Sequence, residues 1–158
     1  MAGRVASKAS GFLDPGQLRD GKLKLQLARC VPADPSREWV PAYIFSMRMP
    51  PGNQLAGSIS LRLGQSAYLQ MYAGQVGYTV ELPYRGQGLA ARSLRLLFPL
   101  ARRHGLNPLW VTCNPDNVAS RKTCERAGGI LVETVDVPAD TELYARGDIQ
   151  KCRYRFDL

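Results

Sequence analysis

The sequence predicts a single mixed α/β (α+β) domain, built on a twisted sheet of about seven strands with helices on its faces. Three observations lead to this prediction. The chain has 158 residues, 45% of them hydrophobic, which suits one core and is too short for two full domains. Its patterns run from strands to strand–helix–strand–helix and then to a hairpin. No internal repeat or low-complexity tract interrupts that order.

Strand signals fill the first half of the chain, where apolar and polar residues alternate as in strands with one buried face. The predicted strands are residues 22–27, 39–49 and 54–63. Lys22 and Lys24 occupy the outward positions of the first strand, which suits a sheet edge. Residues 50–53, Pro-Pro-Gly-Asn, predict a turn.

Four stretches lack such periodicity. Residues 1–20 are small, polar and rich in glycine, which predicts a mobile arm or a first turn. Residues 31–37 predict a connection with room for a turn at most. Residues 65–73 are ambiguous and are expected to be a loop with a short turn, and residues 138–150 are expected to be a long, mostly polar loop.

The second half alternates strands and helices. A strand over residues 76–80 is closed by Pro83, and a helix over 89–103 ends at Gly105. Pro99 is expected to kink that helix. The remaining predicted elements are a strand over 109–113, a helix capped by Asp116 or Asn117 and ended by Gly128, and strands over 130–137 and 151–158.

Composition restricts the classes of function. The net charge of +8 fits a phosphate-bearing partner or simply a solvated basic surface. Aromatic residues do not alternate with basic ones, so the pattern that favours nucleic-acid binding is missing. With one histidine, a histidine-based metal site is not expected. The four cysteines form no C-x-x-C pair, and no apolar run reaches membrane-spanning length. The N-terminus lacks the apolar segment of a secretion signal. We therefore expect a cytoplasmic protein with reduced thiols.

A glycine-rich turn, Tyr84-Arg-Gly-Gln-Gly-Leu-Ala90, joins the strand over 76–80 to the helix over 89–103. Such a turn points several backbone N–H groups at one spot beside a helix N-terminus, which predicts a site for phosphate oxygens. Residues 86–91 also fit the dinucleotide fingerprint G-x-G-x-x-A. That fingerprint requires a carboxylate after the next strand, which here ends in Cys113-Asn114. No Gly-Lys-Ser/Thr follows, so a Walker loop is excluded.

The same turn meets the pattern R-x-x-G-x-A through Arg85, Gly88 and Ala90, and the run from Asn114 to Gly128 follows one helix and one strand later. Together these motifs resemble the GNAT superfamily of N-acetyltransferases, over residues 56–129. The resemblance implies a sheet splayed between its fourth and fifth strands. It implies acetyl-CoA as co-substrate, no metal, and direct attack by an amine of a small molecule or peptide in a ternary complex.

The resemblance also implies which residues bind the co-substrate. The loop over 85–90 would hold the pyrophosphate, the free backbone groups of Val80 and Leu82 would bond the pantetheine arm, and an N–H of Thr79 or Val80 would face the acetyl oxygen. For Asn117 a helix-capping role is an equal alternative. The expected binding residues are Thr79, Val80, Leu82, Arg85, Gly86, Gln87, Gly88, Leu89, Ala90, Asn114, Asn117 and Ser120.

Two residues are candidates for proton transfer. Glu81 is placed where members often carry a carboxylate base, although an ordinary surface glutamate is the alternative. The superfamily commonly has a tyrosine general acid in a pattern like Tyr-Glu-Lys-x-Gly, and the matching place here reads Cys124-Glu-Arg-Ala-Gly128. Cys124 is therefore the candidate acid, with plain packing as its alternative. Tyr84 and Tyr144 are fallback donors.

The acceptor is not named by these motifs. Family members usually place one or two helices between their first two strands, and this chain has room only for a turn, which predicts an open acceptor side or one completed in a homodimer. The rival interpretation is an inactive acyl-CoA-binding module of the same fold. A basic nucleic-acid binder is the third.

Overall fold

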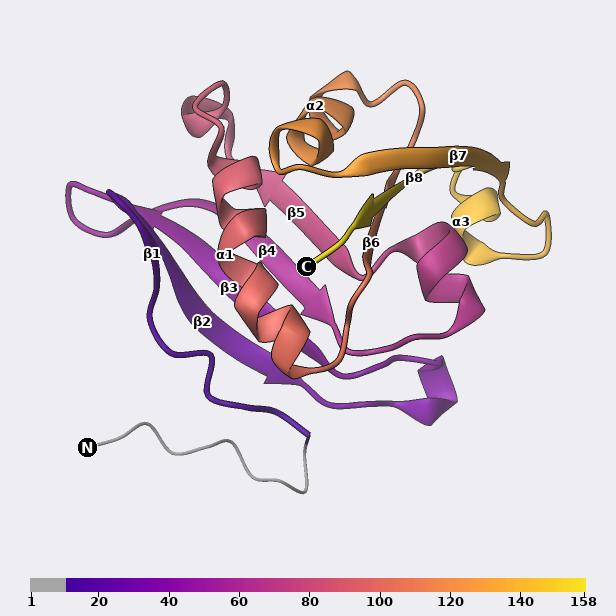
Figure 1. Ribbon diagram of the computed structural model, residues 1–158, viewed down its shortest axis with the longest axis horizontal. Coiled ribbons are helices and arrows are strands. Elements are labelled where there is room, and N and C mark those ends of the chain that lie inside the picture. Colours follow the sequence, from indigo (N-terminus) through magenta and orange to yellow (C-terminus); the bar gives the residue numbers. More distant parts are fainter. Residues whose placement is uncertain (1–10) are drawn as a thin grey trace.

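The computed structural model describes residues 11–158, which form two antiparallel sheets and their covering helices (Figure 1). The larger sheet has the strand order β1-β2-β3-β4-β5 and the smaller one the order β6-β8-β7. In the larger sheet the bounds are β1 Leu18–Asp20, β2 Leu23–Val31, β3 Ala42–Met49, β4 Gln54–Arg62 and β5 Val76–Val80. In the smaller one they are β6 Leu109–Cys113, β7 Ile130–Asp136 and β8 Gln150–Phe156. The predicted mixed fold class is confirmed.

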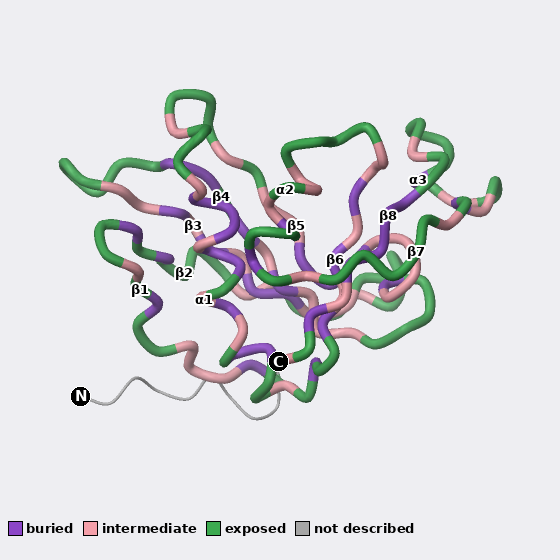
Figure 2. The backbone as a smooth tube through the Cα atoms, turned by 45° about the horizontal axis from the view of Figure 1, so that its top comes forward, coloured by how far each residue is buried: buried purple, intermediate pink, exposed green. Residues whose placement is uncertain are grey.

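The core lies between the larger sheet and helix α1 (Leu89–Arg103), whose bounds are those predicted (Figure 2). Alternate side chains of β3 and β4 and the apolar stripe of α1 fill it. Its members include Tyr43, Phe45, Met47, Ile59, Leu61, Leu94, Leu97 and Leu100, all almost fully buried. The helix continues through Pro99. This packing sets the start of α1 beside the end of β5.

Gln75, just before β5, joins the two sheets. Its backbone N–H donates to the carbonyl oxygen of Trp110 over 2.8 Å, and its side-chain oxygen accepts from the N–H of Trp110 over 2.8 Å. Beyond this point β5 and β6 form no strand pairing. The two strands therefore separate, which confirms the predicted splay between the fourth and fifth predicted strands.

Helices cover both faces of the smaller sheet. On one face, Phe156 of β8 packs against Phe98 of α1, and the hydroxyl of Tyr154 donates to Glu125 of α2 (Val118–Arg126). On the other face, Arg153 donates to the carbonyl oxygen of Gln70 in a π-helical turn, Leu69–Ala73.

Both predicted loops contain helical structure. The π-helical turn Leu69–Ala73 lies within residues 65–73, and the short helix α3 (Glu142–Ala145) lies within 138–150. The turn Leu69–Ala73 agrees with the short turn expected in the first of these loops. Helix α3 was not predicted, because its single buried residue, Leu143, leaves no periodic signal.

Residues 1–20 were predicted to be a mobile arm or a first turn, and residues 1–10 lie outside the described part of the chain. Residues 11–20 pack against the domain and end in β1. Phe12 is 3% exposed and packs edge-on against the ring of Tyr43. The backbone N–H of Leu13 donates to the Tyr43 hydroxyl over 2.6 Å. β1 pairs with the start of β2, so Lys22 and Lys24 do not mark the sheet edge there. Long-range contacts order this segment, and local sequence does not reveal them.

Three further features bear on function. The connection between β2 and β3 holds only a 3-10 turn, Pro35–Arg37, which agrees with the predicted lack of helices there. Across residues 11–158, no helix has the length and apolar character needed to cross a bilayer. No group of three or more His, Cys, Asp or Glu side chains in the same range is arranged to hold a metal ion.

Candidate functional site

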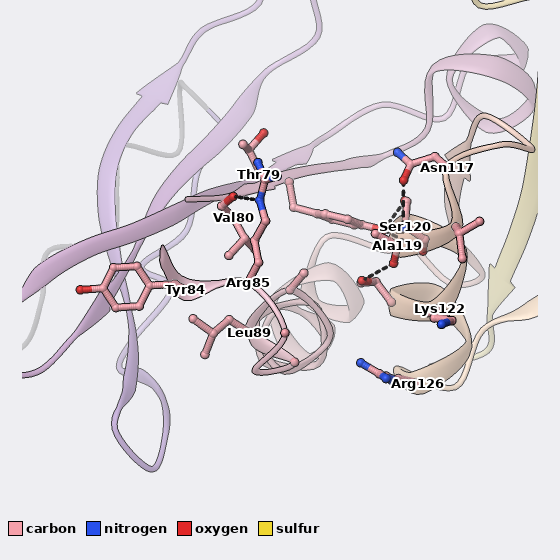
Figure 3. Close-up of a pocket in the computed structure, with 16 residues that line it drawn as sticks. Thr79, Val80, Tyr84, Arg85, Leu89, Asn117, Ala119, Ser120, Lys122 and Arg126 are labelled. Carbon is pink, nitrogen blue, oxygen red and sulfur yellow. Dashed lines mark hydrogen bonds between the residues drawn. The ribbon is translucent and has the colours of Figure 1, made fainter. Parts of the chain in front are cut away.

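A cavity of about 600 Å³ lies between the end of β5 and helix α2, which follows β6 in the chain (Figure 3). Three segments enclose it: the end of β5, the glycine-rich loop with the first turn of α1, and one face of α2. The lining residues are Tyr78, Thr79, Val80, Tyr84, Arg85, Gly86, Gly88, Leu89, Ala90, Asn117, Val118, Ala119, Ser120, Lys122, Thr123 and Arg126. Most of the predicted binding residues therefore lie together.

The glycine-rich loop presents unpaired backbone donors to this cavity. Gly88 is the N-cap residue of α1, has a left-handed φ of 70° and offers no capping side chain. Within residues 11–158, no backbone N–H from Gly86 to Ala91 donates a hydrogen bond. The first N–H groups of a helix have no partner inside the helix, and they carry the positive end of its dipole. The loop is therefore a ready site for an anion.

Three cationic side chains add to this positive potential, namely Arg85, Lys122 and Arg126. Arg85 is tied to the strand because its Nε donates to the carbonyl oxygen of Val80 over 2.9 Å. The residues lining the cavity include no carboxylate. An anionic ligand would thus meet backbone donors on one side and cations on the other.

The edge of β5 that faces the cavity offers the backbone N–H of Val80. The N–H of Glu81 donates to the carbonyl oxygen of Ala56 in β4 over 2.8 Å. Bonded pairs alternate in an antiparallel ladder, so Thr79, opposite Ser58, also directs its N–H at β4. Of the two N–H groups predicted to face the acetyl oxygen, Val80 alone has its N–H on the open edge. The prediction for Thr79 is corrected on this point.

The first turn of α2 carries Asn117 and Ser120. The side-chain oxygen of Asn117 accepts from the N–H of Ser120 over 3.1 Å, so the helix-capping role is confirmed. The Ser120 hydroxyl lies 2.7 Å from the hydroxyl of Tyr78, which crosses the gap from β5. Sequence reasoning did not assign Tyr78 a role, because its strand alternation is equally typical of a core tyrosine.

Cys124 lies behind Tyr78 and is not among the lining residues. It has no solvent exposure, and its sulfur is 3.6 Å from the Tyr78 hydroxyl oxygen. Burial raises the pKa of the Cys124 thiol to about 12. These observations favour the packing alternative for Cys124, and its predicted role as an acid stays a prediction.

The other predicted residues do not line the cavity. Glu81 and Gln87 have exposed side chains, and Leu82 is 72% exposed. Asn114 donates from its side-chain nitrogen to Asp148 over 2.7 Å, while its side-chain oxygen is buried without a partner. The oxygen of Asn114 is thus a buried acceptor without a partner among the described residues.

Several lining residues on α2 were missed. Val118, Lys122 and Arg126 recur every four residues, and that spacing places them on one helix face. The signal was present in the sequence, but it became informative only once this face was known to meet the glycine-rich loop.

Comparisons with known proteins agree with this geometry. Residues 14–130 match the family model described as an acetyltransferase (GNAT) domain. No curated protein sequence matches the chain.

Solved structures share the fold. A RimL ribosomal L7/L12 alpha-N-protein acetyltransferase superposes with a TM-score of 0.62 at 19% identity, over 89% of this chain and 97% of that one. An acetyltransferase from Salmonella typhimurium, described as modifying the N-terminal serine of ribosomal protein L7/L12, superposes with a TM-score of 0.55 at 21% identity, over 78% and 66%. The microcin C7 self-immunity acetyltransferase MccE, solved with acetyl-CoA and AMP, superposes with a TM-score of 0.57 at 18% identity. That match covers 74% of this chain and 61% of MccE.

Proposed function

The chain belongs to the GNAT family of acetyltransferases, which use acetyl-CoA, and from this premise we propose that it acetylates the terminal amino group of a protein or peptide. The observation that carries the proposal is the cavity at the splay. It combines the free N–H groups of Gly86 to Ala91 with the cations Arg85, Lys122 and Arg126. This combination suits the phosphate groups of a nucleotide-bearing thioester.

The residues present fit the rest of acetyl-CoA. The N–H of Val80, on the open edge of β5, would bond the pantetheine arm or the acetyl oxygen. Ser120 and Asn117 line the opposite wall. Asn114 does not line the cavity, and its contact with the arm remains a proposal supported by its place just after β6. Leu82 and Gln87 remain proposals supported by their place beside this loop.

Transfer proceeds in one ternary complex. The amine nitrogen bonds to the acetyl carbon, the carbon–sulfur bond breaks, and coenzyme A leaves with the electron pair on sulfur. Negative charge that develops on the carbonyl oxygen needs a preorganised donor, for which the Val80 N–H is placed. Glu81, just beyond the end of β5, would accept the amine proton directly or through a water.

The acceptor side supports a macromolecular amine. Between β2 and β3 only the turn Pro35–Arg37 is present, so no helices wall off the approach to the splay. The similar structures named above include enzymes described as acting on ribosomal protein L7/L12, one of them at its N-terminal serine. A small-molecule amine is the alternative acceptor. A homodimer that completes this side stays a prediction, which the mass in solution would test. All four cysteines are free thiols, which supports a cytoplasmic location.

Binding is tested by thermal unfolding with and without acetyl-CoA. Ligand at about a hundred times its Kd adds roughly 2.7 kcal/mol of stability, a shift of several degrees. The matched variants are Arg85→Ala, at the cavity, and Arg102→Ala, an exposed arginine at the far end of α1. We expect Arg85→Ala alone to reduce the shift. A wild-type protein that gains no stability from millimolar acetyl-CoA would contradict the site assignment.

Turnover is tested by release of the coenzyme A thiol with a panel of peptides that differ in the first residue, beside small amines. Peptides with a free N-terminus should support release and N-acetylated peptides should not. Turnover on small amines alone would overturn the proposed acceptor. Acetyl-CoA binding without turnover on any amine would favour the inactive acyl-CoA-binding module.

A further inference from the structure

Tyr78 connects the two walls of the cavity. Its ring lines the cavity from β5, and its hydroxyl oxygen lies 2.7 Å from the Ser120 hydroxyl on α2. The same hydroxyl donates to the carbonyl oxygen of Ser120 over 3.3 Å and lies 3.6 Å from the sulfur of Cys124. One phenol therefore stands between the buried thiol and the space in which the co-substrate would lie.

The position of this hydroxyl is rigidly defined from both sides. β5 carries the ring, and Ser120 is held in the first turn of α2 by the cap from Asn117. Burial raises the pKa of the Tyr78 phenol above its ordinary value, so the hydroxyl keeps its proton in the working pH range but is a weaker acid than a free phenol. What distinguishes Tyr78 from Cys124 is its position, because Tyr78 lines the cavity and Cys124 does not. Tyr78 is thus a neutral proton source that contacts a second hydroxyl.

Other acidic groups at the cavity are less suited. Tyr84 is the other phenol among the residues that line it, and its hydroxyl is bound to Gln54. Cys124 is fully buried behind Tyr78 and does not reach the cavity. The remaining lining hydroxyls are aliphatic alcohols of serine and threonine, which are much weaker acids than a phenol.

We propose that the hydroxyl of Tyr78, supplied from β5, is the general acid that protonates the departing thiolate of coenzyme A. This inference rests on the proposed function. As the amine nitrogen bonds to the acetyl carbon, the carbon–sulfur bond breaks and its electron pair stays on sulfur. The sulfur takes the phenol proton and leaves as a thiol. The phenolate regains a proton from water through the Ser120 hydroxyl, and the amine gives its surplus proton to the base, so protons and charge balance.

The test begins with Tyr78→Phe, which keeps the ring and removes the proton. We expect kcat to fall about a hundredfold, while KM for acetyl-CoA changes less than about threefold. Replacing Tyr78 by tetrafluorotyrosine restores a phenol that is more acidic. The fluorinated phenol loses its proton at a lower pH than tyrosine does, and the deprotonated form cannot act as the acid. The pH profile of kcat should therefore fall on its alkaline side at a pH where the profile of the wild type is still flat.

The matched control is Tyr154→Phe. Tyr154 also ties a strand to α2, through Glu125 and Arg121, but it does not line the cavity. The Tyr154→Phe variant should lose about as much stability as Tyr78→Phe, but its kcat should stay within about twofold of the wild-type value. If Tyr78→Phe retains kcat, or if the fluorinated protein shows no new limb, Tyr78 is not the acid. If the wild type neither binds acetyl-CoA nor turns over, the proposed function fails instead.

Discussion

The side-chain amide of Asn114, just after β6, donates to the carboxylate of Asp148 over 2.7 Å. This hydrogen bond ties the loop before β8 to the end of β6. Asp148 also accepts from Arg146 over 2.7 Å and lies 3.5 Å from the ammonium group of the buried Lys151. Burial alone would raise the pKa of Asp148. The hydrogen bonds from Asn114 and Arg146 and the charge of Lys151 outweigh that effect and hold the pKa below its usual range.

These interactions of Asp148 predict a loss of stability at low pH. Because the folded-state pKa of Asp148 is depressed, its contribution is present above the ordinary carboxyl pKa and is lost as pH falls through the lower folded value. Asp148→Asn should lower the free energy of unfolding at pH 7 by about 1–3 kcal/mol, with a smaller difference at pH 3. Urea unfolding at both pH values measures this. Asp157→Asn, which breaks only the exposed pair with Arg155, should cost under about 0.5 kcal/mol.

Alanine substitution at Gly88 and at Gly105 should separate the effect of backbone strain on stability from the effect on ligand binding. They flank α1, have left-handed φ values of 70° and 73°, and an added methyl would touch no atom at either. Alanine at either position should therefore cost about 1–2 kcal/mol of stability. Only Gly88→Ala should also weaken acetyl-CoA, because its methyl group enters the cavity. Calorimetric titration of both variants checks this. Equal affinities would show that the loop does not approach the co-substrate closely.

The reactivity of the four cysteine thiols tests the role of Cys124. Cys113, Cys124 and Cys152 are buried, whereas Cys30 is partly exposed. In the native protein a thiol-specific reagent such as Ellman's should modify one thiol readily, and all four only after unfolding. Peptide mapping should place the native modification at Cys30. Rapid native modification of Cys124, blocked by acetyl-CoA, would instead support its predicted role in the acid step.

His104, the single histidine, predicts a second pH effect. Its ring nitrogen lies 2.7 Å from the hydroxyl of Tyr43, and burial, aided by the charge of Arg103, lowers its pKa. A depressed folded-state pKa means that stability is complete above the ordinary value near 6.5 and declines as pH falls toward the folded value. The one imidazole proton signal should titrate below that value. His104→Gln should remove this part of the slope between pH 7 and 5, and an unchanged slope would contradict the assignment.

Local pattern predicted most elements well. Helix α1 spans Leu89–Arg103 as predicted, because its stripe at spacings of three and four and its glycine boundaries are read over a few residues. The glycine-rich loop was predicted to bind an anion for the same reason, since the capping geometry is local. The segment that local pattern described poorly has the opposite property. Residues 11–20 are held by contacts with distant parts of the chain, such as the hydrogen bond from the N–H of Leu13 to the Tyr43 hydroxyl.

The sequence predicted the binding part of the candidate site better than its proton-transfer residues. The loop residues and the first turn of α2 were identified from their motifs, and the cavity does bring them together. Glu81 and Cys124 were placed by position in a motif, which does not report where a side chain points. In the structure one is exposed beyond the strand and the other is buried behind Tyr78.

The sequence by itself determined the family, the order of strands and helices, and the backbone chemistry of the anion loop, because each depends on neighbouring residues. Only the tertiary structure decided which side chains share the cavity. Tyr78 and Ser120 are 42 residues apart, and their 2.7 Å contact exists because β5 and β6 separate and α2 packs across the gap. Proximity of this kind is produced by packing of the whole chain and leaves no local signal.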